Sequence, residues 1–196
     1  AVLTTMLPRS IRTFIDVFSG LPAIGPRSAM RLAFYLIGLG EASVTQIADA
    51  VRGLGTLTTC PDCFFFSDGP PCSLCGNPDR QKDILAVVER PTDVLAIEKT
   101  HRFHGVYLVL GELKKVGGFT PDQKLKLAHT KARGPFSEVI IAFDQTTYGD
   151  FNASAVMKEL VGSAAKMTRL GRGIPTGGEI EFADEDTLGA AFDNRG

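Results

Sequence analysis

The N-terminal third of the chain carries apolar residues at the three- and four-residue spacing of amphipathic helices. A turn-rich segment from Gly20 to Pro26 separates the first helix from the second, and Pro26 suits a first helical turn, where its missing N–H is not needed. Three helices are therefore predicted before residue 58, from the spacing of Ile11, Phe14, Ile15 and Phe18, of Ala29, Leu32, Ala33, Leu36 and Ile37, and of Val44, Ile47, Ala48, Val51 and Leu54.

The apolar pattern changes beyond residue 80, where short continuous apolar runs replace the helical spacing. Such runs are typical of strands that are buried on both faces of a parallel sheet. Four strands are predicted, at 84–88, 106–110, 139–143 and 166–170. Helices are predicted between them, one capped by Thr92, one over 121–133 and one from about Phe151 to Leu160. This alternation predicts a small α/β domain with a largely parallel sheet, and hence an α+β chain as a whole.

The formal net charge of −1 on 196 residues excludes a uniformly basic protein, but the charge is unevenly distributed. Residues 1–57 carry five arginines against three acids, and residues 81–168 carry twelve basic against ten acidic residues. Residues 58–80 have one arginine against three acidic residues, and residues 169–196 have three arginines against six acidic residues. The basic N-terminal part suits a polyanion, whereas the acidic segments suit protein partners or assembly.

All four cysteines lie in two Cys-x2-Cys pairs separated by eight residues. This spacing predicts one tetrahedral zinc ion per chain, with Cys60, Cys63, Cys72 and Cys75 as its ligands. A site closed by four thiolates has no open coordination position, so the zinc would be structural. Two labile disulfides or a redox pair are the alternative, although no charged or helical context would activate a thiol here.

A second candidate site lies at the turn between the first two helices. Gly25 precedes the second helix, whose first backbone N–H groups can hold a phosphate oxygen. Arg27 and Arg31 lie one turn apart on the same helix face and can reach flanking phosphates. Contacts of this kind position DNA without reading its sequence. A solvated helix face beside an ordinary turn is the alternative interpretation.

Acidic residues follow two of the predicted strands. Glu89 comes directly after the first strand with Asp93 one turn beyond it, and Asp144 ends the third. Carboxylates at these strand ends lie where α/β sheets bind ligands, and they can hold Mg²⁺. The third strand is followed by Asp144-Gln145-Thr146, so one carboxylate of an Asp-x-Asp pair is missing, which leaves Mg²⁺ binding open. Helix capping and surface charge are the alternative.

Several other functions lack their motifs. No Gly-x4-Gly-Lys-Ser/Thr motif occurs, and the three histidines form no motif, so neither a P-loop ATPase nor a catalytic residue is predicted. No stretch approaches the roughly 18 consecutive apolar residues of a membrane span. The first ten residues lack the charged start and apolar run of a signal peptide. A cytoplasmic protein without membrane association is expected.

The order of these features resembles the RecR family of bacterial recombination mediators. The segment 21–34, LPAIGPRSAMRLAF, is similar to the family's helical hairpin, and a four-cysteine zinc finger follows it. The segments 87–94, VVERPTDV, and 105–111, GVYLVLG, resemble the first part of its Toprim domain. The segment 168–185, TRLGRGIPTGGEIEFADE, is similar to its C-terminal, Walker-B-like region, so that the match spans nearly the whole chain.

This resemblance implies a division into four segments. They are a helix-hairpin-helix DNA-binding domain at 1–57, a zinc finger at 58–80, a Toprim domain at 81–168 and a C-terminal assembly segment at 169–196. It also implies dimers or ring-like tetramers and a location at the bacterial nucleoid.

The function implied by the resemblance is that of a non-enzymatic mediator of the RecF pathway of DNA repair, which helps load RecA onto single-stranded DNA. Arg27 and Arg31 would contact double- and single-stranded DNA, and Glu89 and Asp93 would engage RecO. RecF would supply the ATPase. A metal-dependent Toprim enzyme, a nuclease or a primase-like protein acting on DNA, is the alternative.

Two departures from the family pattern concern single positions. Ala23 stands where the family has glycine, and an alanine there is strained if the backbone needs a positive φ. Tyr148 stands where family members have a carboxylate, which we expect Asp150 to replace in part.

Overall fold

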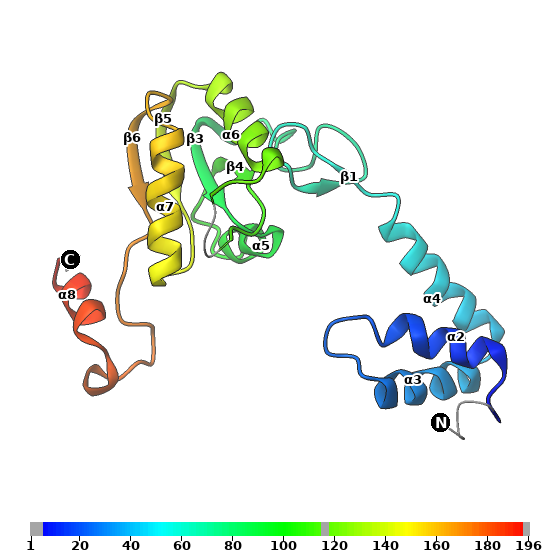
Figure 1. Ribbon diagram of the computed structural model, residues 1–196. Helices are drawn as coiled ribbons and strands as arrows, with labels where there is room; N and C mark the ends of the chain where they lie inside the picture. The colour runs from blue at the N-terminus through cyan, green and yellow to red at the C-terminus, as the bar shows by residue number, and fades with distance from the viewer. Residues whose placement is uncertain (1–5, 115–117, 194–196) are drawn as a thin grey trace. The chain divides into compact units, whose positions relative to one another are not determined.

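The computed structural model describes residues 6–114 and 118–193 (Figure 1). The chain divides into two compact units, Ala1–Leu57 and Thr58–Gly196. The first unit is helical, and the second contains the cysteine-rich segment, a parallel sheet with its helices and the C-terminal segment.

The helical unit consists of α2 (Arg9–Phe18), α3 (Pro26–Leu39) and α4 (Glu41–Leu54), as the apolar spacing predicts. Gly40 alone separates α3 from α4, and its φ of 83° is one that glycine adopts without strain. The described part of the unit buries three side chains, those of Ile15, Ala29 and Ala33. Its core is therefore small, and many of its apolar side chains remain exposed.

The second unit is built on a four-stranded sheet of β3 (Gln81–Val88), β4 (Gly105–Val109), β5 (Phe136–Ile141) and β6 (Ala164–Arg169). Its spatial order is β4-β3-β5-β6, and every neighbouring pair is parallel. All of β4 and the last four residues of β3 are buried, as expected of strands that are covered on both faces. The prediction of a parallel sheet is confirmed, with small shifts in the strand ends.

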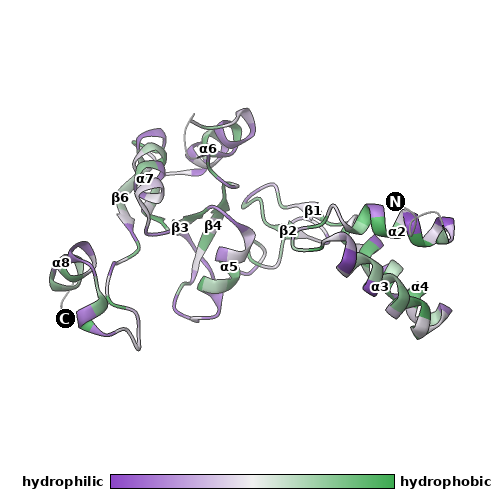
Figure 2. Ribbon diagram, turned by 60° about the horizontal axis from the view of Figure 1, so that its bottom comes forward, coloured by the Kyte–Doolittle hydropathy of each residue, from purple (hydrophilic) through white to green (hydrophobic). Residues whose placement is uncertain are grey.

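Different elements cover the two faces of this sheet. Leu127 of α6 (Pro121–Arg133) and Val156 of α7 (Thr147–Glu159) belong to the core cluster on one face. Val94 of α5 (Pro91–Glu98) and three of the cysteines belong to the cluster on the other. Figure 2 shows the apolar residues concentrated in β3 and β4 between these layers. The cysteine-rich segment thus forms part of the hydrophobic core.

Two helices begin earlier than the sequence predicted. α5 begins at Pro91 rather than after Thr92, and the Asp93 carboxylate accepts the backbone N–H of Arg90 at 2.8 Å. α7 begins at Thr147, ahead of Phe151, because the Thr146 hydroxyl accepts the N–H of Gly149 at 3.0 Å. In both helices, a side chain that satisfies a backbone N–H at the first turn fixes the starting point.

The remaining elements are short. β1 (Thr58–Thr59) and β2 (Phe66–Ser67) pair in an antiparallel ribbon on either side of the first cysteine pair. Beyond β6 lie a single 3-10 turn, η1 (Ile180–Phe182), and the helix α8 (Glu185–Asp193). Neither α8 nor any other helix in the described stretches is long and apolar enough to cross a membrane.

Candidate metal centre and nucleic-acid interface

The four cysteines converge on one point. Cys60, Cys63 and Cys72 are buried and Cys75 is half-buried, and all four sulfur atoms lie within 4.8 Å of one another. The Sγ atoms of Cys63 and Cys72 are 3.4 Å apart, far longer than a disulfide bond, and all four cysteines are free. A tetrahedral site with metal–sulfur bonds of about 2.3 Å would place its sulfurs about 3.8 Å apart. The cluster is therefore positioned to bind one metal ion.

The thiols differ in how readily they lose a proton. Hydrogen bonding to Cys63 lowers the pKa of Cys75 to about 6. The same hydrogen bond, together with burial, raises the pKa of Cys63, and burial raises the pKa of Cys72. One thiolate thus forms easily, whereas the buried thiols release their protons when a bound cation compensates the charge.

Backbone carbonyls fix the cysteine-rich segment to the sheet. The N–H of Val109 on β4 donates to the carbonyl of Cys63 at 2.8 Å. Nη1 of Arg133, at the end of α6, donates to the carbonyl of Asp62 at 2.6 Å. These contacts hold the turn between the first two cysteines, so the position of this cysteine pair depends on the sheet.

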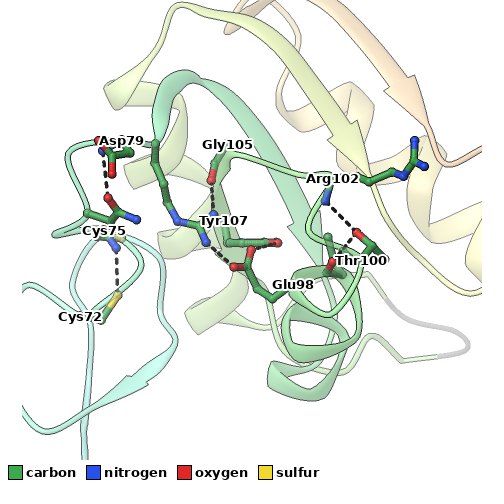
Figure 3. Close-up of polar contacts among 11 residues, drawn as sticks. Cys72, Cys75, Asp79, Glu98, Thr100, Arg102, Gly105 and Tyr107 are labelled. Carbon is green, nitrogen blue, oxygen red and sulfur yellow. Dashed lines mark hydrogen bonds and ion pairs between the residues drawn. The ribbon is translucent and has the colours of Figure 1, made fainter.

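Arg80 links the segment to α5 and β4. Its Nη1 donates to the carbonyl of Gly105 at 2.7 Å, and its guanidinium pairs with Glu98. The Tyr107 hydroxyl donates to Oε1 of Glu98 at 2.6 Å (Figure 3). Burial would raise the pKa of Glu98, but the hydrogen bonds from Arg80 and Tyr107 outweigh it and lower that pKa. Sequence reasoning missed this cluster, because 18 residues separate Arg80 from Glu98 and no motif contains both.

The helical hairpin displays the residues expected to contact DNA. Gly25, in extended backbone, precedes α3, and Arg27 and Arg31 are exposed on the first two turns of that helix. The N–H of Ala29 donates to the carbonyl of Gly25 at 2.9 Å. The N–H groups that precede it lie in the first turn of α3, where a helix supplies no backbone acceptor. Ala23 has a φ of 62°, so the strain expected of alanine at this glycine position is present.

The acidic residues expected at the strand ends lie around a cleft of about 350 Å³ lined by Glu89, Asp144 and Tyr148 among others. Burial raises the pKa of Glu89, and the charge of Asp144 adds to the effect. Between the acids lies Arg90, whose Nη2 is 2.7 Å from Oδ2 of Asp144. Within the described stretches, the four cysteines are the one group of possible ligands that is gathered closely enough for a metal ion. Glu89, Asp93 and Asp144 do not form such a group in the described residues.

Asp150 does not join these acids. Its Oδ1 accepts hydrogen bonds from Arg172 and Arg169, and the bond from Arg172 contributes most to lowering the pKa of Asp150. Asp150 lines a separate cavity with Arg172 and Asp184. The expectation that Asp150 replaces the missing carboxylate is therefore wrong, because this side chain instead holds the C-terminal segment to α7.

Comparison with known proteins first defines the class. The model of the RecR helix-hairpin-helix matches residues 11–53, that of a Toprim domain matches residues 83–171, and that of the RecR C-terminal region matches residues 173–195. A hairpin followed by a Toprim domain is the arrangement of a recombination protein rather than of the alternative enzyme.

Individual relatives then give the family. Two relatives named "Recombination protein RecR", from two strains of Clostridium perfringens, are 40% identical to the chain over 191 residues. The match covers 96% of this chain and 96% of each relative. The chain therefore belongs to the RecR family.

Proposed function

We propose that this chain is a DNA-binding recombination mediator that acts without catalysis of its own. The exposed pair Arg27 and Arg31 on the first turns of α3, behind the Gly25 turn, carries the proposal. The hairpin would hold phosphates of double- or single-stranded DNA, with the first N–H groups of α3 on one oxygen and the arginines on its neighbours. A protein that works in this way acts at the bacterial nucleoid.

The test is the salt dependence of DNA binding by the full chain. Replacing Arg27 and Arg31 by alanine together should weaken duplex binding and lower the log–log salt slope by roughly 0.9 for each lost phosphate contact. The matched control is Arg52→Ala, which removes an exposed arginine of the same unit that is already paired with Asp49. An unchanged slope and affinity in the double variant would refute the DNA site.

We propose further that the metal is zinc, one structural ion per chain, held by Cys60, Cys63, Cys72 and Cys75. Four thiolates suit zinc, and a four-thiolate site leaves no position for a substrate. Zinc supplies the positive charge that the buried thiols need to ionise, and the carbonyl contacts of the segment keep them in place. Metal analysis of the purified protein should find one zinc per chain, and Cys63→Ser should lose it. A folded protein with four titratable thiols and no metal would contradict the assignment.

The partners of the chain are also a proposal: a RecO-type protein at Glu89 and Asp93, and a RecF-type protein that supplies ATP hydrolysis. Glu89 lies in the cleft at the strand ends and is only partly buried. Asp93 also caps α5, so its replacement would disturb the helix. Glu89→Gln is the cleaner test, and it should weaken binding of a RecO-type partner while leaving DNA binding unchanged. Equal partner binding would exclude Glu89 from the interface.

Assembly into a dimer or tetramer is the last part of the proposal. The helical unit exposes a set of large apolar side chains that its own core does not cover, namely Phe34, Tyr35, Ile37, Val44, Ile47, Val51 and Leu54. Exposed apolar surface of this extent marks a protein–protein contact. Light scattering should give a multiple of the 21.0 kDa chain mass, and Ile37→Glu should lower it. A wild-type protein of single-chain mass at micromolar concentration would refute assembly.

A further inference from the structure

The cleft at the carboxyl ends of β3 and β5 combines acids with one internal arginine. Glu89, Glu112 and Asp144 line it together with Arg90. Asp93 lies in the first turn of α5 and contacts the same arginine. An acidic cleft at this edge of a parallel sheet is where a divalent cation would be expected.

Arg90 engages two of the acids at once. Its Nη2 donates to Oδ2 of Asp144 at 2.7 Å, and its Nε lies 3.7 Å from Oδ1 of Asp93. The second oxygen of Asp93 accepts the backbone N–H of Arg90 at 2.8 Å. One oxygen of Asp93 and one of Asp144 therefore accept hydrogen bonds from this residue, and the other oxygen of Asp93 lies within ion-pair distance of its guanidinium.

Glu89 is also turned to a partner within the chain. The backbone amide of Leu113, in the segment that follows β4, opposes the effect of burial and lowers the pKa of the Glu89 carboxyl, so this amide lies near the carboxylate. A small divalent cation needs several oxygen ligands directed at one point. Here one oxygen of Asp93 and one of Asp144 are directed instead at two donors of Arg90, its backbone N–H and its Nη2.

We infer that Arg90 is a built-in counter-ion, which takes in this chain the place that a divalent cation would take among Toprim acids. Its side chain is partly exposed, but its guanidinium is hydrogen-bonded to Asp144 and ion-paired with Asp93, so it remains a charged partner for both acids at every physiological pH. The cleft is thereby kept organised without Mg²⁺, and its affinity for divalent cations is low because a fixed positive charge lies among the ligands. This inference is independent of the proposed DNA site.

The test is calorimetric titration of the zinc-loaded full chain with MgCl₂ and, in parallel, electron paramagnetic resonance with MnCl₂. Arg90→Gln should bind either ion at least about tenfold more tightly than wild type, since a unit charge about 5 Å from a divalent ion repels it by that factor even at the dielectric constant of water. Arg90→Lys, which retains the charge, should stay as weak as wild type. Arg102→Gln removes an exposed arginine beyond the other end of α5 and should change nothing.

Equal affinity of wild type and Arg90→Gln would overturn the inference. The backbone N–H that binds Asp93 remains in Arg90→Gln, so α5 should form, and a thermal melt checks this. Mg²⁺ titration of the wild-type protein is a second test, which does not require Arg90→Gln to fold. If wild type binds Mg²⁺ with a submillimolar Kd that Glu89→Gln abolishes, the cleft is a cation site with Arg90 in place, and the inference is wrong.

Discussion

The two units of the chain differ in how their apolar residues are used. In the sheet unit, Leu85, Leu108 and Val139 are fully buried between two layers of helices and the cysteine-rich segment. In the helical unit, Val51 and Leu54 follow an equally regular apolar pattern but remain more than half exposed. Regular apolar spacing therefore predicts a helix or strand in both units, whereas only the sheet unit completes a core by itself. The helical unit leaves its apolar side chains exposed.

The largest expected contrast comes from truncating one side chain in each unit. Leu85→Ala should lower the free energy of unfolding by about 2–5 kcal/mol, because it empties a fully buried site in β3. Val51→Ala, on α4, should cost less than about 0.5 kcal/mol if its surface faces water. Urea unfolding followed by circular dichroism measures both. A cost for Val51→Ala that approaches that of Leu85→Ala would show that the face of α4 is covered in solution.

A smaller effect is expected where α7 packs against the end of β5. A Cβ atom on Gly149 would lie 1.9 Å from the backbone oxygen of Asp144, so the backbone itself would have to move. Gly149→Ala should therefore destabilise the sheet unit by about 1–3 kcal/mol. Gly189→Ala is the control, since it adds the same atom in open space on α8 and should be neutral or stabilising. Equal melting temperatures for the two variants would contradict the close approach at Gly149.

The Arg80–Glu98–Tyr107 cluster predicts a pH dependence in the same unit. The pKa of Glu98 is lowered in the folded state, so its contribution to stability is present above the ordinary value of 4.5 and is lost as the pH falls through the folded value. Glu98→Gln should lower stability at pH 7 by about 1–2 kcal/mol. As the pH is lowered below 5, the Tm of this variant should also fall less than the Tm of the wild type. If the Tm of wild type and the Tm of the variant fall equally as the pH is lowered below 5, Glu98 does not contribute to the pH dependence.

The smallest effect is expected in the helical unit. Ala23 has a φ of 62°, which costs an alanine about 1 kcal/mol but costs glycine little. Ala23→Gly should raise the free energy of unfolding of this unit by about 0.5 kcal/mol, because the greater freedom of the unfolded glycine offsets part of the gain. Ala48→Gly, within α4, should lower it by about 1 kcal/mol. Losses of similar size in both variants would show that the turn does not need glycine geometry.

The sequence predicted those features that depend on residues close together in the chain. The spacing of Cys60, Cys63, Cys72 and Cys75 indicated the metal centre, because each pair turns back on itself within four residues. Apolar runs indicated β3, β4 and β5, since burial on both faces excludes polar side chains. β6 contains Lys166, Thr168 and Arg169 and has no fully buried residue, so its signal in the sequence was weaker. The hairpin residues Arg27 and Arg31 were placed correctly on one exposed helix face, but their contact with DNA remains a prediction.

What could not be predicted are the pairings between distant residues. Asp150 was expected among the cleft acids, yet it pairs with Arg169 and Arg172, which approach it only once β6 has joined the sheet. The pair of Arg80 and Glu98 also depends on the folded sheet. Arg90 could have been noticed, since it stands between Glu89 and Asp93, where a positive charge is unexpected in an acidic motif. Its contact with Asp144, 54 residues away, required the structure.

The contact between Val109 and Cys63 has a consequence for the behaviour of the protein without its metal. β4 is one of the two edge strands of the sheet, and an edge strand with free N–H and C=O groups is a template to which a strand of another molecule can add. The carbonyl of Cys63 accepts a hydrogen bond from the N–H of Val109, so the cysteine-rich segment covers this edge of the sheet. If metal loss releases the segment, the exposed edge of β4 can pair with strands of other chains. Metal-depleted protein is therefore expected to aggregate, and metal supply would govern how much of the chain stays in solution.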